Sequence, residues 1–344
     1  MTLFPLIRPV LFGLNPELAH HLTIAALKYS PRRKSIAHDP LLSCNVAGLI
    51  FPTPIGLAAG FDKDAEVARA ALGLGFGFVE VGTLTPQPQV GNPKPRLFRL
   101  VEDRSVINRM GFNNCGHAAA HARLEAYRGS GLIGVNIGAN KDSADRIADY
   151  VSGVRAMADV AAYLTINISS PNTPGLRGLQ DKGALLALLE AVRAARGEAG
   201  PPLFLKLAPD LEPRAIDDIA EIAVPRVEAL IIGNTTLERP SLRSKHACET
   251  GGLSGAPLAT LAHQRLRDFR KATGGTIPLI AAGGIACADD VYARIRSGAC
   301  LVQLYSALVY HGPGLVGKIT KGLKTRLIKD GFVNVAGAVG IDAR

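Results

Sequence analysis

Short apolar segments alternate with helical patterns along most of the chain. Eight apolar segments predict buried strands, at residues 55–59, 78–82, 132–137, 163–168, 203–207, 229–233, 279–282 and 301–305. Apolar residues recur at helical spacing between most of them, at 65–74, 143–157, 183–196, 213–222, 259–271, 288–297 and 316–327. Alternating strands and helices predict parallel βαβ units, and eight units in roughly 250–300 residues have the size of a (β/α)8 TIM barrel.

A doubly wound open sheet is the alternative α/β fold for such a pattern. That fold is expected to carry a G-x-G-x-x-G turn after its first strand. The residues that follow the first predicted strand, within Gly56-Leu57-Ala58-Ala59-Gly60, do not supply this turn. The sequence therefore favours the barrel.

Two connections are too long for simple loops. After the second strand, apolar residues alternate in 95–100 and 105–108 on either side of a polar turn at 102–104, which predicts an inserted β-hairpin. A second insertion covers residues 235–257. Long excursions at one face of a barrel usually build or cover its site.

The first forty residues differ from the rest, and we separate a helical segment, 1–40, from a barrel, 41–344. An apolar stretch up to Leu14 is interrupted by prolines, and a second helix is predicted over 16–29, with Asn15 as its N-cap. The apolar stretch is too short to span a bilayer and lacks the order of a secretory signal. The two helices either pack on the barrel, contact a membrane or form the mouth of a tunnel for an apolar substrate. Nearby basic residues favour an anionic lipid surface: Arg8, Lys28, Arg32, Arg33 and Lys34.

Composition narrows the classes of function. The chain has 344 residues and a formal net charge of +10, but its Lys and Arg are scattered rather than gathered into a stripe with aromatic platforms. This pattern disfavours nucleic acid and leaves an anionic membrane surface or a phosphorylated cofactor. The five cysteines include no C-x-x-C pair, which indicates a reducing, cytosolic compartment. No H-E-x-x-H motif or Cys/His ligand set is present, so no metal is expected.

Polar residues gather where the predicted strands end. In a barrel these ends meet at one mouth, and a ring of polar groups there predicts a polar ligand. The ring comprises Lys63, Thr83, Asn136, Asn167, Ser170, Lys206, Asn234, Gly283, Gly284, Tyr305 and Ser306. The glycine pair and Tyr305-Ser306 occupy the usual phosphate position of the fold, after strands seven and eight.

The stretch Asn167-Ile168-Ser169-Ser170-Pro171-Asn172-Thr173-Pro174-Gly175-Leu176-Arg177 is the strongest candidate for the chemistry. Asparagine amides suit the imide edges of a planar heterocycle. Ser170 is a poor base in water and suits that role only if hydride removal makes the transferred proton acidic. Lysines at strand ends leave a Schiff-base aldolase open as a second enzyme class.

Three long motifs resemble those of the dihydroorotate dehydrogenase family. They are Asn167 to Arg177, the run Ser105-Val106-Ile107-Asn108-Arg109-Met110-Gly111-Phe112-Asn113-Asn114, and Ala58-Ala59-Gly60-Phe61-Asp62-Lys63. The similarity runs over essentially the whole chain and includes Asn15-Pro16-Glu17-Leu18-Ala19-His20. The serine at 170, where soluble members carry cysteine, and the apolar N-terminal extension resemble the quinone-linked, membrane-associated class.

This resemblance implies a function. It implies a barrel that holds FMN over its mouth and oxidises dihydroorotate to orotate in pyrimidine (UMP) biosynthesis. Electrons would leave to a quinone that enters past the N-terminal helices, with the protein peripheral on the cytoplasmic face of the inner membrane. Ser170 would be the base that takes the C5 proton while the C6 hydride goes to the flavin.

The resemblance also implies binding roles. The substrate would be held by Lys63, Asn108, Arg109, Met110, Gly111, Phe112, Asn167, Asn172, Asn234 and Thr235. FMN would be held by Ala59, Gly60, Phe61, Asp62, Lys63, Thr83, Asn136, Asn167, Lys206, Gly233, Gly255, Gly284, Tyr305 and Ser306. Lys206 would stabilise the reduced, anionic flavin. Gly233 departs from the family pattern, which has a hydroxyl residue there, so only a backbone contact is expected from this position.

Overall fold

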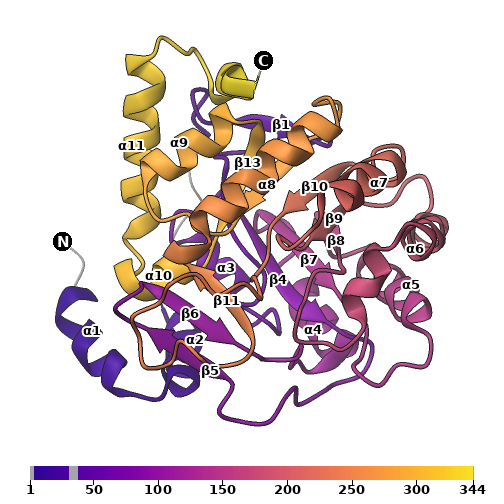
Figure 1. Ribbon diagram of the computed structural model, residues 1–344, viewed down its shortest axis with the longest axis horizontal. Coiled ribbons are helices and arrows are strands. Elements are labelled where there is room, and N and C mark those ends of the chain that lie inside the picture. The colour runs from indigo at the N-terminus through magenta and orange to yellow at the C-terminus, as the bar shows by residue number, and fades with distance from the viewer. Residues whose placement is uncertain (1–3, 31–37, 344) are drawn as a thin grey trace.

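Eight parallel strands close into a barrel in the computed structural model, which describes residues 4–30 and 38–343 (Figure 1). In chain order the strands are β3 (Ile55–Leu57), β4 (Phe78–Leu84), β7 (Leu132–Ile137), β8 (Tyr163–Asn167), β9 (Leu203–Leu207), β10 (Ala229–Ile232), β12 (Leu279–Ala282) and β13 (Ala299–Leu304). The barrel closes through the pairing of β13 with β3. The predicted barrel is confirmed, and each of its strands ends within two residues of the predicted position.

Helices cover the outside of the barrel. They are α3 (Ala68–Leu72), α4 (Gly116–Glu125), α5 (Arg146–Met157), α6 (Lys182–Arg196), α7 (Pro213–Ala223), α8 (Ala259–Ala272), α9 (Ala288–Arg296), α10 (Ser306–His311) and α11 (Leu315–Lys329). Short 3-10 helices are η1 (Leu176–Gln180), η2 (Ala256–Leu258), η3 (Val335–Ala338) and η4 (Ile341–Ala343). The seven predicted helices are confirmed, whereas α4 and α10 are additions.

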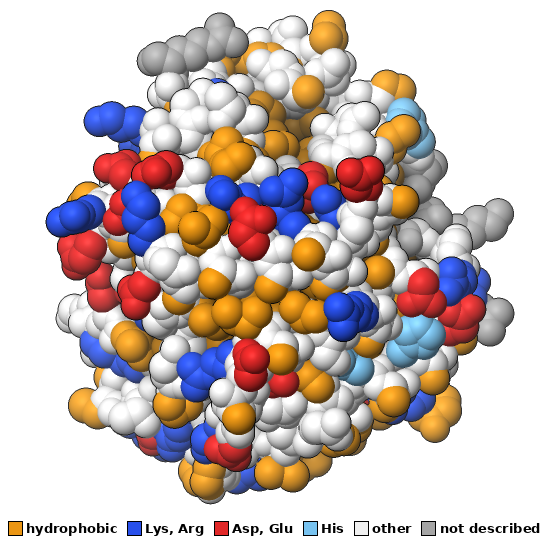
Figure 2. All heavy atoms as spheres, turned by 90° about the vertical axis from the view of Figure 1, so that its right-hand side faces the viewer, with side chains coloured by type: hydrophobic (Ala, Val, Ile, Leu, Met, Phe, Trp, Pro, Cys, Tyr) orange, Lys and Arg blue, Asp and Glu red, His pale blue; other side chains and the backbone are white. Residues whose placement is uncertain are grey.

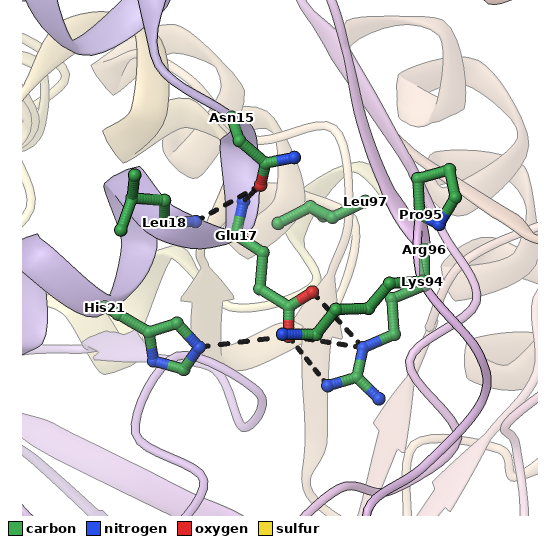
Figure 3. Close-up of a pocket in the computed structure, with 8 residues that line it drawn as sticks. All are labelled: Asn15, Glu17, Leu18, His21, Lys94, Pro95, Arg96 and Leu97. Atoms are coloured by element: carbon green, nitrogen blue, oxygen red, sulfur yellow. Dashed lines mark hydrogen bonds and ion pairs between the residues drawn. The ribbon is translucent and has the colours of Figure 1, made fainter.

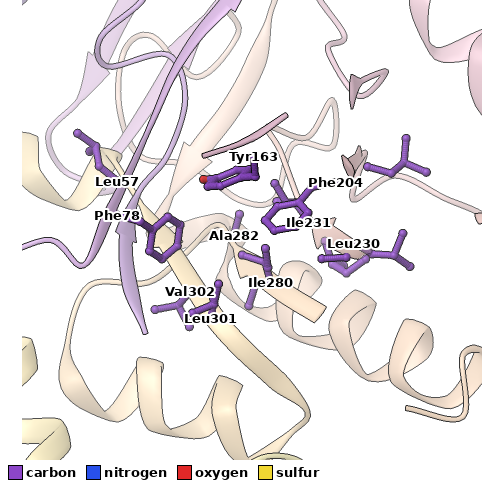
Figure 4. Close-up of a cluster of buried hydrophobic side chains, with 14 of the residues drawn as sticks. Leu57, Phe78, Tyr163, Phe204, Leu230, Ile231, Ile280, Ala282, Leu301 and Val302 are labelled. Carbon is purple, nitrogen blue, oxygen red and sulfur yellow. The ribbon is translucent and has the colours of Figure 1, made fainter. Parts of the chain in front are cut away.

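Aromatic rings fill the amino-terminal end of the barrel (Figure 4). The rings of Tyr163 and Phe204 stack with centroids 4.4 Å apart, and Phe78 lies edge-on to Tyr163. The neighbouring strands carry glycine where these rings pass. A Cβ at Gly56 would lie 2.2 Å from the Phe78 ring, and one at Gly134 would lie 2.1 Å from the Tyr163 ring. Only glycine at these two positions leaves room for the large rings in a close-packed core.

A two-stranded antiparallel sheet that the sequence analysis did not predict precedes the barrel. It consists of β1 (Cys44–Val46) and β2 (Leu49–Phe51). The Phe51 ring lies edge-on to Phe78, with centroids 5.0 Å apart. Since Phe78 is the first residue of β4, this small sheet covers the amino-terminal end of the barrel and leaves the opposite end for the site.

The predicted hairpin is confirmed as β5 (Leu97–Leu100) and β6 (Ser105–Asn108), paired antiparallel. The second insertion adds β11 (Gly252–Gly255) to the free edge of β6. Two insertions far apart in the sequence thus form one three-stranded sheet beside the barrel mouth (Figure 1). A small apolar cluster of Phe98, Leu100, Ile107 and Leu253 holds the sheet together.

The N-terminal segment forms two helices, α1 (Phe4–Gly13) and α2 (Pro16–Lys28), next to β5 and β6 (Figure 1). Asn15 caps α2 as predicted, because its Oδ1 accepts hydrogen bonds from the backbone N–H of Glu17 and Leu18. No helix in the described part of the chain has both the length and the apolarity needed to cross a bilayer. The basic cluster Arg32-Arg33-Lys34 lies outside the described residues.

Charges of both signs are interspersed on the face formed by α5, α6 and α7, which Figure 2 presents to the viewer. Ion pairs link these helices. Lys182 contacts Asp218 and Glu221, and Arg226 contacts Glu190. Basic residues on this face therefore have acidic neighbours and do not build a single-sign surface.

Candidate active site

The polar ring predicted at the strand ends is assembled in the structure. Asn136 on β7 and Asn167 at the end of β8 are buried, as are Thr83 on β4 and Lys206 on β9. The Asn167 amide donates to Thr83 Oγ1 at 3.0 Å and to Asn136 Oδ1 at 2.9 Å. Side chains from three strands thus form one hydrogen-bonded layer across the mouth of the barrel.

The layer continues through a residue that the sequence analysis did not single out. Ser169 Oγ donates to Asn167 Oδ1 at 2.7 Å and accepts from Asn234 Nδ2, also at 2.7 Å. Ser169 is completely buried. Ser169 therefore connects the end of β8 with the loop after β10. Its position between Asn167 and Ser170 is the feature of the sequence that could have marked it as a site residue.

Ser170 lies in the loop after β8 with its side chain almost fully buried. Its Oγ accepts a hydrogen bond from the backbone N–H of Asn172 at 3.2 Å. The Asn172 amide in turn faces Asn108 Oδ1 at 3.4 Å, so the loop after β8 and the β6 hairpin strand approach each other here. Two motifs that are sixty residues apart in sequence therefore share one site.

Arg177 fixes the loop that carries Ser170. Its guanidinium donates to the backbone carbonyls of Ser169 at 3.1 Å and Thr235 at 3.1 Å. It also forms an ion pair with Asp210 at 2.7 Å. Charge-assisted bonds of this kind are stronger than neutral ones, so the loop is held in one geometry.

The two strand-end lysines have different surroundings. Burial lowers the pKa of Lys63 to about 8, an effect that Glu17 opposes and Arg96 reinforces. Burial also lowers the pKa of Lys206, which the carboxylate of Glu80, 3.9 Å away, opposes. Lys206 makes no hydrogen bond to any described residue, so its donors remain available to a ligand.

Three glycines predicted to bind the cofactor adopt backbone conformations in the left-handed region. Gly233, Gly255 and Gly284 have φ values of +119°, +99° and +67°. A Cβ at Gly233 would lie 2.1 Å from Ala282 O, and one at Gly284 would lie 2.2 Å from Ala259 Cα. Both conformation and space therefore require glycine, which explains why position 233 carries no hydroxyl residue.

Two serines connect the three-stranded sheet to the last loop of the barrel. Ser254 Oγ lies 2.8 Å from Ser306 Oγ, and Ser306 begins α10 directly after Tyr305. Gly255 follows Ser254 at the end of β11. The predicted cofactor residues Gly255, Tyr305 and Ser306 thus lie in one region.

The predicted loop 59–63 leads from the barrel towards α2. The Phe61 ring lies edge-on to Tyr305 and to His20, with centroids 5.6 Å and 5.7 Å away. Burial and the nearby Lys63 lower the pKa of His20 to about 3, so its imidazole is neutral at physiological pH. Asp62 turns back to its own chain and accepts from the backbone N–H of Glu66 and Val67.

The predicted substrate loop 108–112 is held by glutamine and asparagine side chains. Gln89 donates to the carbonyls of Gly111 and Phe112, both at 3.1 Å. The Asn92 side chain donates to the Arg109 carbonyl at 3.1 Å, and its backbone N–H donates to the Met110 carbonyl at 3.0 Å. The side chain of Arg109 forms an ion pair with Glu249 at 2.9 Å, so it contacts the second insertion.

A pocket of about 250 Å³ lies beside the mouth, between α2 and the start of β5 (Figure 3). Glu17 projects into it and pairs with Arg96 at 2.7 Å, and both side chains are buried. Burial alone raises the pKa of Glu17, but the hydrogen bonds and charge of Arg96 outweigh this and lower it. Lys94 Nζ and His21 Nε2 lie 3.6 Å and 3.8 Å from Glu17 Oε1.

A cluster of two carboxylates and one histidine lies on the surface. His121 and Glu125 lie four residues apart on α4, and Asp159 follows α5, so that the possible ligand atoms of these three residues come together. Arg128 already donates to Glu125 at 2.8 Å and to Asp159 at 3.0 Å. One protein cation therefore compensates part of the negative charge of these two exposed carboxylates.

Comparisons with known proteins agree over almost the whole chain. The model of the dihydroorotate dehydrogenase family matches residues 41–327. A protein of Novosphingobium aromaticivorans named dihydroorotate dehydrogenase (quinone) is 61% identical, over 99% of either chain. One of the same name from Erythrobacter litoralis is 62% identical, over 98% of this chain and 99% of its own.

Solved structures give the same result. The crystal structure of dihydroorotate dehydrogenase from Eimeria tenella in complex with ferulenol has a TM-score of 0.91 and 41% sequence identity. The similarity covers 97% of this chain and 99% of that one. The family model, the relatives and the fold therefore coincide, and the chain belongs to the dihydroorotate dehydrogenase family.

Proposed function

We propose that this protein oxidises dihydroorotate to orotate in pyrimidine biosynthesis and passes the electrons to a membrane quinone. The observation that carries the proposal is the amide layer of Asn136, Asn167 and Asn234 beside Ser170 at the barrel mouth. It occurs in a chain 61% identical to a protein named dihydroorotate dehydrogenase (quinone). A row of amides suits a substrate that presents several ring N–H and C=O groups.

FMN is the cofactor that we infer for this site. Lys206 has no hydrogen-bond partner among the described residues, and Thr235 Oγ1 and Ser105 Oγ are buried without partners there. Gly233, Gly255 and Gly284 keep side chains out of the same region. Together with the hydroxyl groups of Ser254 and Ser306, these features fit a phosphorylated, planar cofactor.

FMN would be held by the predicted groups around the mouth. They are the backbone of Ala59, Gly60, Phe61, Asp62, Gly233, Gly255 and Gly284, and the side chains of Lys63, Thr83, Asn136, Asn167, Lys206, Tyr305 and Ser306. When bound, FMN supplies the two-electron acceptor that dihydroorotate oxidation needs.

Ser170 is the base in this proposal. The backbone N–H of Asn172 donates to Ser170 Oγ at 3.2 Å and favours the anionic form of that oxygen, which becomes neutral when it takes the C5 proton. Asn108, Asn172, Asn234 and Thr235 hold the ring amides, and Lys63 pairs with the substrate carboxylate. Residues Arg109 to Phe112 complete the substrate loop, with Arg109 acting through its backbone.

The segment 1–40 is proposed to bring the protein to the membrane surface and to admit the quinone. Apolar side chains on α1 and α2 face solvent, with Leu6 75% and Val10 70% exposed, together with Ile7, Leu18 and Leu22. The ring contacts from His20 through Phe61 to Tyr305 lead from α2 towards the barrel mouth. We infer a peripheral protein on the cytoplasmic face of the inner membrane, in contact with anionic lipids.

A Schiff-base aldolase receives no support from these contacts. Lys206 is paired with the carboxylate of Glu80, which favours the charged amine rather than a free nucleophile. Lys63 lies beside the Glu17–Arg96 pair and suits an anionic group of the substrate.

The proposed electron acceptor, a quinone, can be tested by measuring how fast orotate forms. We expect purified protein loaded with FMN to form orotate from dihydroorotate at a rate that depends on an added short-chain quinone. Nicotinamide nucleotides should not replace the quinone. Orotate formation that proceeds equally well with a nicotinamide nucleotide would contradict the quinone assignment.

A further inference from the structure

One carboxylate inside the barrel has no role in the function proposed above. Glu80 lies in the middle of β4 and is completely buried. An unpaired carboxylate in such a place costs several kcal/mol of folding free energy. Its surroundings therefore have to be arranged around its charge.

Five side chains from four other strands surround the Glu80 carboxylate. Oε1 accepts from Asn136 Nδ2 at 2.7 Å and faces Lys206 Nζ at 3.9 Å. Oε2 accepts from Gln303 Nε2 at 2.7 Å, Thr165 Oγ1 at 3.1 Å and the Tyr163 hydroxyl at 3.2 Å. All of these groups are donors, an environment that suits an ionised carboxylate.

The orientation of Gln303 supports this reading of the site. Its amide nitrogen faces Glu80, while its buried Oε1 has no hydrogen-bond partner among the described residues. A buried oxygen without a donor costs about 1–3 kcal/mol. The hydrogen bond to the Glu80 carboxylate therefore determines the orientation of the Gln303 amide, even though it leaves Gln303 Oε1 without a donor.

Glu80 also determines the direction of the hydrogen bonds above it. Because Asn136 gives its amide nitrogen to Glu80, its Oδ1 is turned towards Asn167 Nδ2. Asn167 Oδ1 consequently accepts from Ser169 Oγ, which accepts from Asn234 Nδ2. One carboxylate thus orients a chain of amides that runs from the barrel interior to the proposed substrate residues.

We propose that Glu80 is a positioning residue that sets the reduction potential of the bound flavin, by balancing the charge of Lys206 and orienting Asn136. This inference rests on the proposed function. The negative charge of Glu80 opposes the gain of negative charge by the cofactor, whereas Lys206 favours it. Glu80 and Lys206 together therefore hold the reduction potential of the flavin between the values that either charge alone would produce.

The test is the midpoint potential of the bound flavin in Glu80→Gln, measured anaerobically against a redox dye. Glutamine keeps the shape but removes the charge, so the equilibrium should move towards reduced flavin by at least tenfold. For a two-electron couple this is about 30 mV. Glu80→Asp keeps the charge and should leave the equilibrium within threefold of the wild type.

Glu228→Gln is the matched control. Glu228 pairs with Arg196 and accepts from the Leu203 N–H at the start of β9, at the other end of the barrel. Its loss removes the same charge without reaching the proposed cofactor, so the potential should not move. An unchanged potential in Glu80→Gln, or equal shifts in Glu80→Gln and Glu80→Asp, would overturn the inference.

A second variant keeps the test valid if Glu80→Gln does not fold. Tyr163→Phe removes only the hydroxyl that donates to Glu80 and keeps the ring in the core. The carboxylate charge is then less compensated, so the potential should shift in the negative direction, and no shift or a positive one would contradict the inference. A wild-type protein that binds no flavin would overturn the proposed function as well, whereas normal flavin with unmoved potentials would overturn this inference alone.

Discussion

Ser170 acquires its proposed role from its neighbours rather than from its own chemistry. A hydroxyl is a weak base, but the N–H of Asn172 stabilises charge on its oxygen, and Arg177 holds the loop in place. No carboxylate or histidine is hydrogen-bonded to Ser170 Oγ within the described residues. The proton therefore has to be drawn from a substrate that is losing a hydride at the same time.

Replacing Ser170 by alanine should separate binding from chemistry. We expect Ser170→Ala to keep FMN and substrate binding but to lower the rate of flavin reduction on the order of 10²- to 10⁴-fold, the usual contribution of a general base. Single-turnover reduction by dihydroorotate, followed anaerobically, measures this rate. Ser152→Ala, on the exposed side of α5, is the matched control, and near-normal reduction in Ser170→Ala would refute the base assignment.

Gly233, which follows β10, offers a test of the proposed FMN site. Gly233→Ala should weaken FMN retention and lower the free energy of unfolding by at least about 2 kcal/mol, because the Cβ meets Ala282 O and φ is +119°. Denaturant unfolding and flavin content measure the two effects. Gly183→Ala in α6, where a Cβ meets nothing, should stay within about 1 kcal/mol of the wild type.

At the scale of single residues, the sequence predicts the site residues at strand ends well and those inside the barrel poorly. Asn136, Asn167 and Lys206 stand out because polar groups interrupt apolar strands. Glu80 interrupts one too, but its partners come from strands that are far away in sequence. Only the closed barrel brings these partners together, so pattern analysis alone had no means of assigning it a role.

At the scale of elements, the Glu17–Arg96 pair joins α2 to the hairpin and to the loop that carries Ser170. Arg96 donates to the backbone carbonyl of Asn92 at 2.9 Å. The Asn92 amide donates to the carbonyls of Arg109 and Asn172, at 3.1 Å and 3.2 Å. The helix beside the proposed quinone entrance is thus connected to the loop that carries Ser170 through partly buried polar contacts.

Breaking this pair should damage stability and quinone turnover together. Glu17→Gln leaves Arg96 buried without its partner, and we expect a loss of roughly 3–5 kcal/mol in the free energy of unfolding. Quinone reduction should fall more than flavin reduction by dihydroorotate. Glu190→Gln, which removes an exposed pair with Arg226, should cost at most about 1 kcal/mol, and equal effects of the two variants would contradict the proposed connection.

The sequence predicts the elements whose apolar pattern is strong and misses those that depend on a neighbour. Helix α4 buries one large aliphatic residue, Leu124, besides Gly116, His117 and Ala120, so it has little apolar stripe. Strand β11 is Gly252-Leu253-Ser254-Gly255, a sequence with no strand signal, and it is ordered by pairing with β6. Both cases reflect tertiary contacts that override local preference.

At the scale of the whole molecule, buried histidines make stability depend on pH. Burial lowers the pKa of His117 from its ordinary value of 6.5 to about 4. The nearby carboxylate of Asp149 opposes this shift only in part. The unfolded chain therefore binds a proton between these values that the folded chain does not, and stability falls as pH falls through this range. His20 acts in the same direction.

Replacing His117 should flatten this dependence. We expect the free energy of unfolding of the wild type to fall between pH 7 and pH 4, with His117 contributing roughly 3 kcal/mol. In His117→Gln the decline should be smaller by that amount. Parallel pH profiles of the two proteins, measured by denaturant unfolding, would show that His117 is not the origin.

The anaerobic visible spectrum of the purified, FMN-loaded protein tests the central claim most directly. We predict an oxidised flavin spectrum, with about one FMN per chain, that one equivalent of dihydroorotate bleaches and that an added quinone restores. The barrel mouth, the amide layer and Ser170 all have to be assigned correctly for this sequence of changes to occur. A protein that takes up no FMN, or whose flavin stays oxidised in the presence of dihydroorotate, would contradict the account.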